Sequence, residues 1–152
     1  MIIKKGNIVF RRLVHSDIET VRNHRNSSDV SQFMEYQEHI TKDMQEKWFI
    51  SINNEFNLFF IIEYKEEKIG LINGKDINWE ENSMETGIFI WSKKYLNTHI
   101  PLLAVLIFAE LGIMTFGLTV YAHILKNNSR AIRYNKLLGF KLCDGQESNN
   151  NQ

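Results

Sequence analysis

The chain has 152 residues, with 18 basic and 18 acidic side chains, so its formal net charge is zero. This length suits one domain around a single hydrophobic core, and the balanced charge gives no support to a nucleic-acid partner. A lone cysteine, Cys143, excludes an internal disulfide and a thiolate metal cluster. We therefore expect a globular cytoplasmic protein that uses no metal.

The sequence predicts neither a signal peptide nor a membrane-spanning helix. The start, MIIKKGNIVFRR, lacks the core of a signal peptide. The most apolar run, residues 100–114, is shorter than the roughly 18 to 20 residues that span a bilayer, and it contains Glu110. We therefore predict a buried helix there and no membrane partner. The polar residues 144–152 are expected to form a tail after a domain that covers residues 1–143.

The first third of the sequence predicts one strand and two helices. The strand covers residues 7–14, and Ser16 or Asp17 then caps a helix that runs to about His24. Thr41 begins a second helix, which ends near residue 54. The apolar face of this second helix is formed by Met44, Trp48, Phe49 and Ile52.

Three strands joined by short turns follow, which is typical of an antiparallel meander. They cover residues 57–64, 68–79 and 84–91. The later elements are the apolar helix at about 100–116, a strand at 118–125, a helix at 128–138 and one more strand that begins at Gly139.

This order predicts an α/β (α+β) fold with a single mixed, mostly antiparallel sheet and helices on both faces. Residues 84–125 read as a strand, a crossover helix and a strand, which indicates a parallel pair within that sheet.

The segment NSRAIRYNKLLGF, together with this order, resembles the GNAT superfamily of acyl-CoA N-acetyltransferases. The family pattern is an asparagine that opens the last helix, a small residue three positions on, and a Gly-Phe pair. Here these are Asn128, Ala131 and Gly139-Phe140, and the resemblance covers about residues 7–143. It implies acetyl-CoA as co-substrate, with Asn128 beside the pantetheine arm. The family fold normally ends with a further strand after Gly-Phe, but only about a dozen mostly polar residues remain here. We expect that strand to be absent, to come from a partner chain, or to belong to a longer chain.

The strand METGIFIW, residues 84–91, resembles the Ala-Glu-Ile-Gly-aromatic strand of the ribosomal-protein N-acetyltransferase branch. In the family this strand splays from its parallel neighbour, and pantetheine pairs with its backbone like an added strand. The resemblance implies this role for Ile88, Phe89 and Ile90. Glu85 is the candidate general base, because an ammonium must lose a proton before the amine attacks. The alternative is that Glu85 is a solvated strand residue.

The next segment resembles the family's pyrophosphate loop, which has a basic residue and then glycines before a helix. Backbone N–H groups and the positive end of that helix bind the phosphates. Lys94 keeps the basic position, but Asn97 and His99 stand where the glycines would be. The resemblance implies that Arg130 either touches the 3′-phosphate or faces water. The implied loop residues are Lys94, Asn97, Thr98, His99 and Ile100.

The family's usual general acid is a tyrosine on the last helix, at a place that Asn135 holds here. Tyr134 is one residue early, about 100° around the helix. Either Tyr134 protonates the departing sulfur, or it only packs and no side chain does so. The second outcome is chemically tolerable, because thiols have a pKa near ~8.5 and leave readily as thiolates.

Residues 21–41, VRNHRNSSDVSQFMEYQEHIT, resemble the substrate-side helices of enzymes that acetylate a nucleotide-linked amino sugar. The resemblance implies acceptor contacts for Arg22, Asn23, His24 and Met34. His24 can instead cap the helix end, and Arg25 joins Arg22 as a candidate for a substrate phosphate or carboxylate. His123 lies beside the expected coenzyme gap, as a core or surface residue or as a catalytic one.

We therefore expect an acetyl-CoA-dependent N-acetyltransferase, monomeric or homodimeric. Its acceptor is a primary amine of a small molecule, such as a nucleotide-linked amino sugar, or a peptide N-terminus. The alternative is a catalytically silent acyl-CoA-binding or interaction module, which the missing glycines, the displaced tyrosine and the missing last strand favour.

Overall fold

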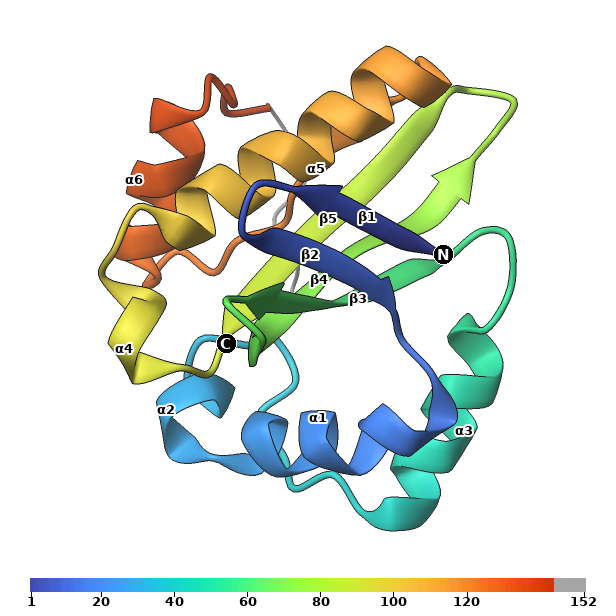
Figure 1. Ribbon diagram of the computed structural model, residues 1–152, viewed down its shortest axis with the longest axis vertical. Helices are drawn as coiled ribbons and strands as arrows, with labels where there is room; N and C mark the ends of the chain where they lie inside the picture. Colours follow the sequence, from blue (N-terminus) through green and yellow to red (C-terminus); the bar gives the residue numbers. More distant parts are fainter. Residues whose placement is uncertain (144–152) are drawn as a thin grey trace.

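The computed structural model of the protein describes residues 1–143 and contains a six-stranded sheet whose strands follow chain order (Figure 1). Neighbours from β1 to β5 are antiparallel, whereas β6 is parallel to β5. The predicted mixed sheet and its parallel pair are therefore confirmed. The strands are β1 (Ile2–Lys5), β2 (Ile8–Arg12), β3 (Leu58–Tyr64), β4 (Glu67–Asn78), β5 (Ser83–Ile90) and β6 (Thr119–Tyr121).

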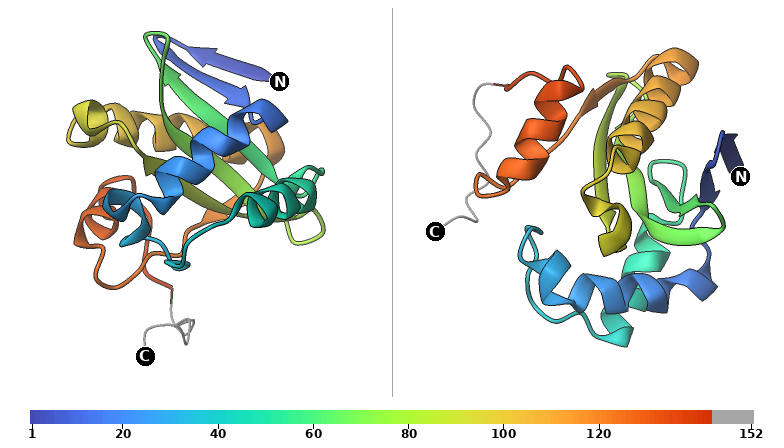
Figure 2. Two further views of the ribbon diagram at one scale, coloured as in Figure 1. Left: turned by 90° about the horizontal axis from the view of Figure 1, so that it is seen from below. Right: turned by 60° about the vertical axis from the view of Figure 1, so that its left-hand side comes forward.

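Helices cover both faces of the sheet, as predicted. The long helix α5 lies over one face, and α1 and α3 lie over the other (Figures 1 and 2). Within the described residues, no helix is long and apolar enough to cross a membrane. The helices are η1 (His15–Asp17, a 3₁₀ turn), α1 (Ile18–Asn26), α2 (Ser28–Ser31), α3 (Lys42–Ile52), α4 (Lys93–Leu96), α5 (Ile100–Phe116) and α6 (Ser129–Leu137).

The core has two halves because successive side chains of a strand point to opposite faces. All four residues 59–62 of β3 are buried. Phe60 packs edge-on against Phe108 of α5, with ring centroids 5.9 Å apart. Phe59 points the other way and meets Trp48 of α3 at 5.3 Å. A continuous apolar strand therefore fastens helices to both faces of the sheet.

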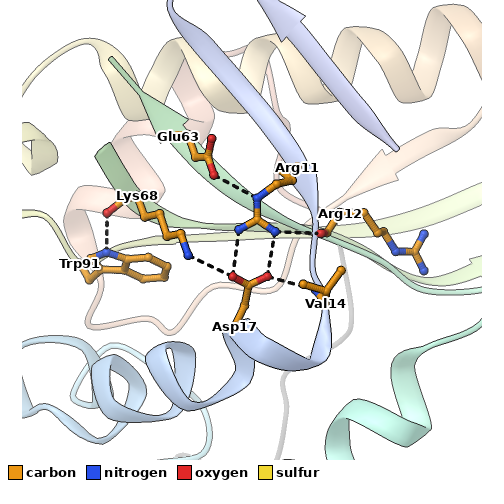
Figure 3. Close-up of polar contacts among 7 residues, drawn as sticks. All are labelled: Arg11, Arg12, Val14, Asp17, Glu63, Lys68 and Trp91. Atoms are coloured by element: carbon orange, nitrogen blue, oxygen red, sulfur yellow. Dashed lines mark hydrogen bonds and ion pairs between the residues drawn. The ribbon is translucent and has the colours of Figure 1, made fainter. Parts of the chain in front are cut away.

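A cluster of charges ties the start of α1 to the sheet (Figure 3). The Asp17 side chain is 3% exposed, and both its oxygens accept hydrogen bonds from Arg11 on β2 at 2.9 Å. Lys68 Nζ of β4 and the Val14 N–H donate to it as well, at 3.2 and 3.1 Å. Burial alone would raise the pKa of Asp17, but the hydrogen bonds from Arg11, Val14 and Lys68 lower it to about 2.

Two features at the N-terminal side differ from the predictions. No strand is predicted before residue 7, yet β1 forms a hairpin with β2 across Gly6, whose φ is +61°. Met44 was placed on the buried face of α3, but it is 37% exposed. Met44 lies in the first turn, where its N–H donates to the Thr41 hydroxyl, so the predicted cap is correct.

The C-terminal side differs in one strand and in the length of another. The predicted strand at 118–125 is shorter, because β6 leaves the sheet after Tyr121. The prediction of a strand that begins at Gly139 is wrong, because residues 139–143 form no strand. Gly139 has φ +89°, and the N–H of Phe140 donates to the carbonyl of Asn135. Gly-Phe therefore closes α6 in a Schellman motif, which a left-handed glycine permits. The tail predicted at 144–152 lies outside the described residues.

Candidate active site

The parallel pair β5–β6 is short, and this opens one side of β5. The two strands pair only from Ser83–Thr119 to Glu85–Tyr121. Beyond that point β5 remains paired with β4 up to Ile90, but its other side has no strand partner in the part of the chain that the structure describes. The predicted splay is therefore present, and it begins directly after Glu85.

Backbone groups of alternate residues point into this opening. The N–H of Trp91 donates to the carbonyl of Ile69 on the β4 side, at 3.0 Å. Because successive residues of a strand direct their backbone groups to opposite edges, Ile88 and Ile90 direct theirs to the open side. These are two of the three residues predicted to pair with pantetheine. Phe89 instead directs its backbone toward β4, and its ring lies on the face that carries α1 and α3.

Glu85 is buried at the point of divergence, with 11% of its side chain exposed. Its Oε1 lies 3.2 Å from Lys75 Nζ and 3.1 Å from His123 Nδ1. Tyr121 is its register partner on β6, and the Tyr121 and His123 rings meet edge-on at 5.7 Å. Burial and the charges of Glu85 and Asp76 raise the pKa of Tyr121. The carboxylate thus lies at the closed end of the opening, where the pairing of β5 with β6 stops.

Lys75 and Tyr121 are members of this cluster that sequence reasoning missed. Both face Glu85 because of strand register, Lys75 on the antiparallel side and Tyr121 on the parallel side. The short turn between β4 and β5 limits how these strands can pair, so the sequence does indicate that Lys75 lies near Glu85. The position of Tyr121 depends instead on how β6 pairs with β5 after the α5 crossover, and no local sequence pattern predicts that pairing.

The N-terminus of α5 faces the end of the opening. Thr98 Oγ1 donates to the Tyr95 carbonyl at 2.7 Å and accepts from the Ile100 N–H at 3.3 Å. Asn97 and His99 are exposed on either side of it. Since α5 has 17 residues, its positive end gives the predicted phosphate loop a suitable electrostatic setting. Lys94 points elsewhere.

The Lys94 ammonium lies 4.8 Å from the centre of the Tyr95 ring and 3.5 Å from Glu67 Oε2. Both neighbours raise the pKa of Lys94, and Tyr95 has the larger effect. The structure therefore joins Lys94 to β4 and does not direct it at the α5 N-terminus.

Helix α6 is joined to the same loop. Arg130 donates a hydrogen bond to the Asn97 side-chain oxygen. Asn128 caps α6, because its side-chain oxygen accepts from the Ala131 N–H at 3.1 Å. The cap leaves the Asn128 amide NH₂ available for a ligand. Of the two residues predicted to meet the coenzyme from α6, Arg130 therefore contacts the predicted phosphate loop, and Asn128 caps the same helix.

Tyr134 and Asn135 behave differently within α6. The Asn135 amide donates to the carbonyl of Ala131, at 2.8 Å, so it is bonded to its own helix. Tyr134 is half-buried, and its hydroxyl has no hydrogen-bond partner within residues 1–143. Of the two side chains, Tyr134 is the one free to donate a proton.

The predicted acceptor residues lie on α1 and in the segment after it. Arg22 is held by Glu19 at 2.7 Å and donates to the Ile40 carbonyl at 2.9 Å, so it supports the loop that precedes α3. Asn23 is exposed and Met34 half-buried. His24 stacks on Trp91, with centroids 4.5 Å and planes 1° apart, and burial lowers its pKa.

Trp91 connects this stack to the charge cluster of Asp17. Its indole N–H donates to the carbonyl of Lys68 at 2.9 Å, and the Lys68 ammonium reaches Asp17 (Figure 3). Helix α1 is therefore attached to the end of β5 through side chains. Among residues 1–143, no three His, Cys, Asp or Glu side chains are gathered as a metal site.

Comparison with known proteins agrees with this geometry. The model of the acetyltransferase (GNAT) domain family matches residues 7–141. A spermidine N-acetyltransferase from Vibrio cholerae, solved with CoA and spermine, has TM-score 0.79 and 17% identity, over 89% of this chain and 81% of that one. A domain from Methanocaldococcus jannaschii DSM 2661 has TM-score 0.83 and 24% identity, over 93% of both chains. A dodecameric structure of the Vibrio enzyme has TM-score 0.71 and 18% identity, over 90% of this chain and 81% of that one. A search of curated proteins found no match.

The solved structures are similar in fold, whereas the family match rests on the sequence itself and spans nearly all of the described chain. The strand divergence after Glu85 and the capped helix α6 are the features that the resemblance implied. The superfamily prediction is confirmed, without a choice of branch. The chain belongs to the GNAT acetyltransferase family and is an N-acetyltransferase.

Proposed function

We propose that the protein moves an acetyl group from acetyl-CoA to the primary amine of a small molecule, with Glu85 as proton acceptor. The observation that carries this proposal is the position of Glu85, a buried carboxylate on β5 at the last pair before β6 diverges. Pantetheine lies along the open side of β5 in this proposal, and its thioester ends beside that carboxylate.

The chemistry then needs three groups. Glu85 takes a proton from the ammonium, directly or through a bridging water, and the freed lone pair attacks the thioester carbonyl. A backbone N–H on the open side, such as that of Ile88, holds the oxyanion. The attacking nitrogen then loses its second proton to water. When the tetrahedral intermediate collapses, the carbon–sulfur bond breaks and the thiolate leaves. Tyr134 is the proposed donor of a proton to that sulfur.

In this proposal the coenzyme phosphates lie at the N-terminus of α5. Thr98, His99 and Ile100 form the loop, and Asn97 is held toward it by Arg130. A half-exposed His123 beside Glu85 leads from the carboxylate toward solvent. Family membership favours this enzyme over the silent acyl-CoA-binding module.

Two measurements test the proposal. Acetyl-CoA at about 100 times its Kd should stabilise the protein by about 2.7 kcal/mol, seen as a thermal shift. Thiol release should then be followed with amino sugars, polyamines and peptides as acceptors, because the spermidine enzymes are similar in fold and amino sugars and peptides are predicted from the sequence. Absence of any shift at millimolar coenzyme would overturn the assignment.

A further inference from the structure

Asn73 of β4 is a buried donor without a partner. Its amide nitrogen is inaccessible to solvent and donates no hydrogen bond to any group among residues 1–143. The Asn73 backbone carbonyl is already engaged by the Thr86 hydroxyl, at 3.1 Å. The side-chain oxygen lies 3.0 Å from where a Cβ of Gly87 would stand. A side chain at position 87 would press on Asn73, so glycine leaves the Asn73 amide its place over β5. The unpaired nitrogen of that amide is destabilising unless a ligand meets it.

Arg25 of α1 is a second such donor. Its Nε is buried with no hydrogen-bond partner in the described part of the chain. The guanidinium carbon lies 5.6 Å from the centre of the Phe89 ring. Burial lowers the pKa of Arg25, but an arginine side chain remains a cation. The acidic groups of the same region are paired with others, Glu19 with Arg22 and Asp29 with Lys93.

Both donors border the same stretch of β5. Glu85, Gly87 and Phe89 alternate onto one face of the sheet, and Asn73 is the register partner of Gly87. The order along that face is therefore the proposed base, the Asn73 amide and the Arg25 cation. From Glu85 to Phe89 the backbone rises by about 13 Å.

We propose that Arg25 and Asn73 bind an anionic group of the acceptor, a carboxylate or a phosphate, that lies several bonds away from the amine held at Glu85. This inference rests on the proposed function, since it uses Glu85 to fix the amine. The anion would complete the ion pair that Arg25 lacks and give Asn73 an acceptor. An α-amino acid is too short to reach both ends, and a polyamine presents a cation to Arg25.

Matched acceptor pairs test the charge requirement. Glucosamine and its phosphate ester form one pair, which probes a phosphate, and ε-aminocaproate and its amide form the other, which probes a carboxylate. The anionic member should have the lower KM in at least one pair. Arg25→Met keeps an aliphatic stem over Phe89 and removes the charge. It should raise the KM of the anionic member by about tenfold or more, with little change for the neutral member, since hydrogen bonds to charged groups are worth this much.

The controls separate this role from packing and from coenzyme binding. Lys4→Met, on exposed β1, removes the same charge and should leave both KM values unchanged. The Kd of CoA should be the same in Arg25→Met as in the parent. A lower affinity for CoA, or an equal rise in KM for both members of a pair, would overturn the inference and leave the proposed function intact.

A binding measurement keeps the two proposals distinguishable. If acetyl-CoA binds and no amine is acetylated, the proposed function fails. Calorimetry with ε-aminocaproate and with glucosamine phosphate still tests the anion site. Binding that Arg25→Met and Asn73→Leu both weaken supports it, whereas binding unaffected by either variant, or no binding of either anion, overturns it.

Discussion

Nδ1 of His123 lies 3.1 Å from Oε1 of Glu85, across the point where β6 departs from β5. The same oxygen is 3.2 Å from the ammonium of Lys75. The carboxylate thus has one neighbour on each side of β5, Lys75 of β4 and His123 of the segment after β6. His123 is half-exposed, so it connects a buried proton acceptor to solvent.

We expect Glu85→Gln to lower turnover by at least about tenfold and to leave the Kd of CoA nearly unchanged, because a base acts on the amine and not on the coenzyme. Glutamine keeps the size of the side chain and can still contact Lys75 and His123. Thiol release under saturating acetyl-CoA measures the loss. Glu81→Gln, in the exposed turn before β5, is the control. Equal rates for mutant and parent from mildly acidic to mildly basic pH would remove Glu85 from the mechanism.

Tyr134→Phe is expected to slow turnover, and most strongly at low pH, where a free thiolate is the poorest leaving group. General acid assistance is worth roughly 10²- to 10⁴-fold, so the loss should be measurable by steady-state kinetics. Tyr121→Phe is the matched control, because burial and the charge of Glu85 raise the pKa of Tyr121 and make it a weaker acid. If Tyr121→Phe gave the larger loss, the acid role would belong to Tyr121.

Asn128 can be separated into a helix cap and a coenzyme ligand. Asn128→Ser keeps an oxygen for the Ala131 N–H but removes the amide NH₂, so stability should hold while CoA binds more weakly. Asn128→Ala should lose both, with about 1 kcal/mol less stability. Thr41→Ala removes the corresponding cap of α3 and should cost a similar free energy of unfolding without affecting CoA. Unchanged CoA affinity in Asn128→Ser would leave Asn128 with the cap alone.

The elements that local patterns define were predictable. The helix expected at about 100–116 matches α5 because its apolar run ends at Gly117, which takes a left-handed φ of +66°. The meander strands follow from their short turns. By contrast, Gly139-Phe140 has the same local pattern whether it ends a helix or begins a strand, and only tertiary pairing separates the two.

In the candidate site, too, the residues within local motifs were predictable, and those brought in by strand pairing were not. Glu85 and Asn128 stand out within short motifs, and the structure places Glu85 where the opening begins and Asn128 at the cap of α6. Lys75, Tyr121 and Asn73 reach the site through strand register, which depends on contacts between distant residues. Arg22 was placed at the acceptor with Arg25, but its partner Glu19 stands three residues earlier on the same helix, a spacing that favours an ion pair.

Asp17 gives the fold a pH dependence whose sign can be stated. Its pKa in the folded protein is about 2, below the ordinary value of 3.8, so the unfolded chain binds the proton more readily. The stabilisation is therefore complete above about pH 4 and is lost as the pH falls from about 4 to 2. For this buried carboxylate it amounts to about 2 kcal/mol.

We expect Asp17→Asn to lower the free energy of unfolding by about 2 to 4 kcal/mol near neutral pH, because it removes the buried carboxylate that Arg11 bonds through two nitrogens and leaves the guanidinium with Glu63 alone. The loss should shrink as the pH falls toward 2, since the parent loses the same interaction there. Urea unfolding at several pH values measures both effects. Asp43→Asn, which breaks an exposed pair with Lys47, should cost less than about 1 kcal/mol. Parallel pH profiles for Asp17→Asn and the parent would show that Asp17 has the same pKa in the folded and unfolded chains. Its contacts with Arg11 and Lys68 would then not favour the charged carboxylate.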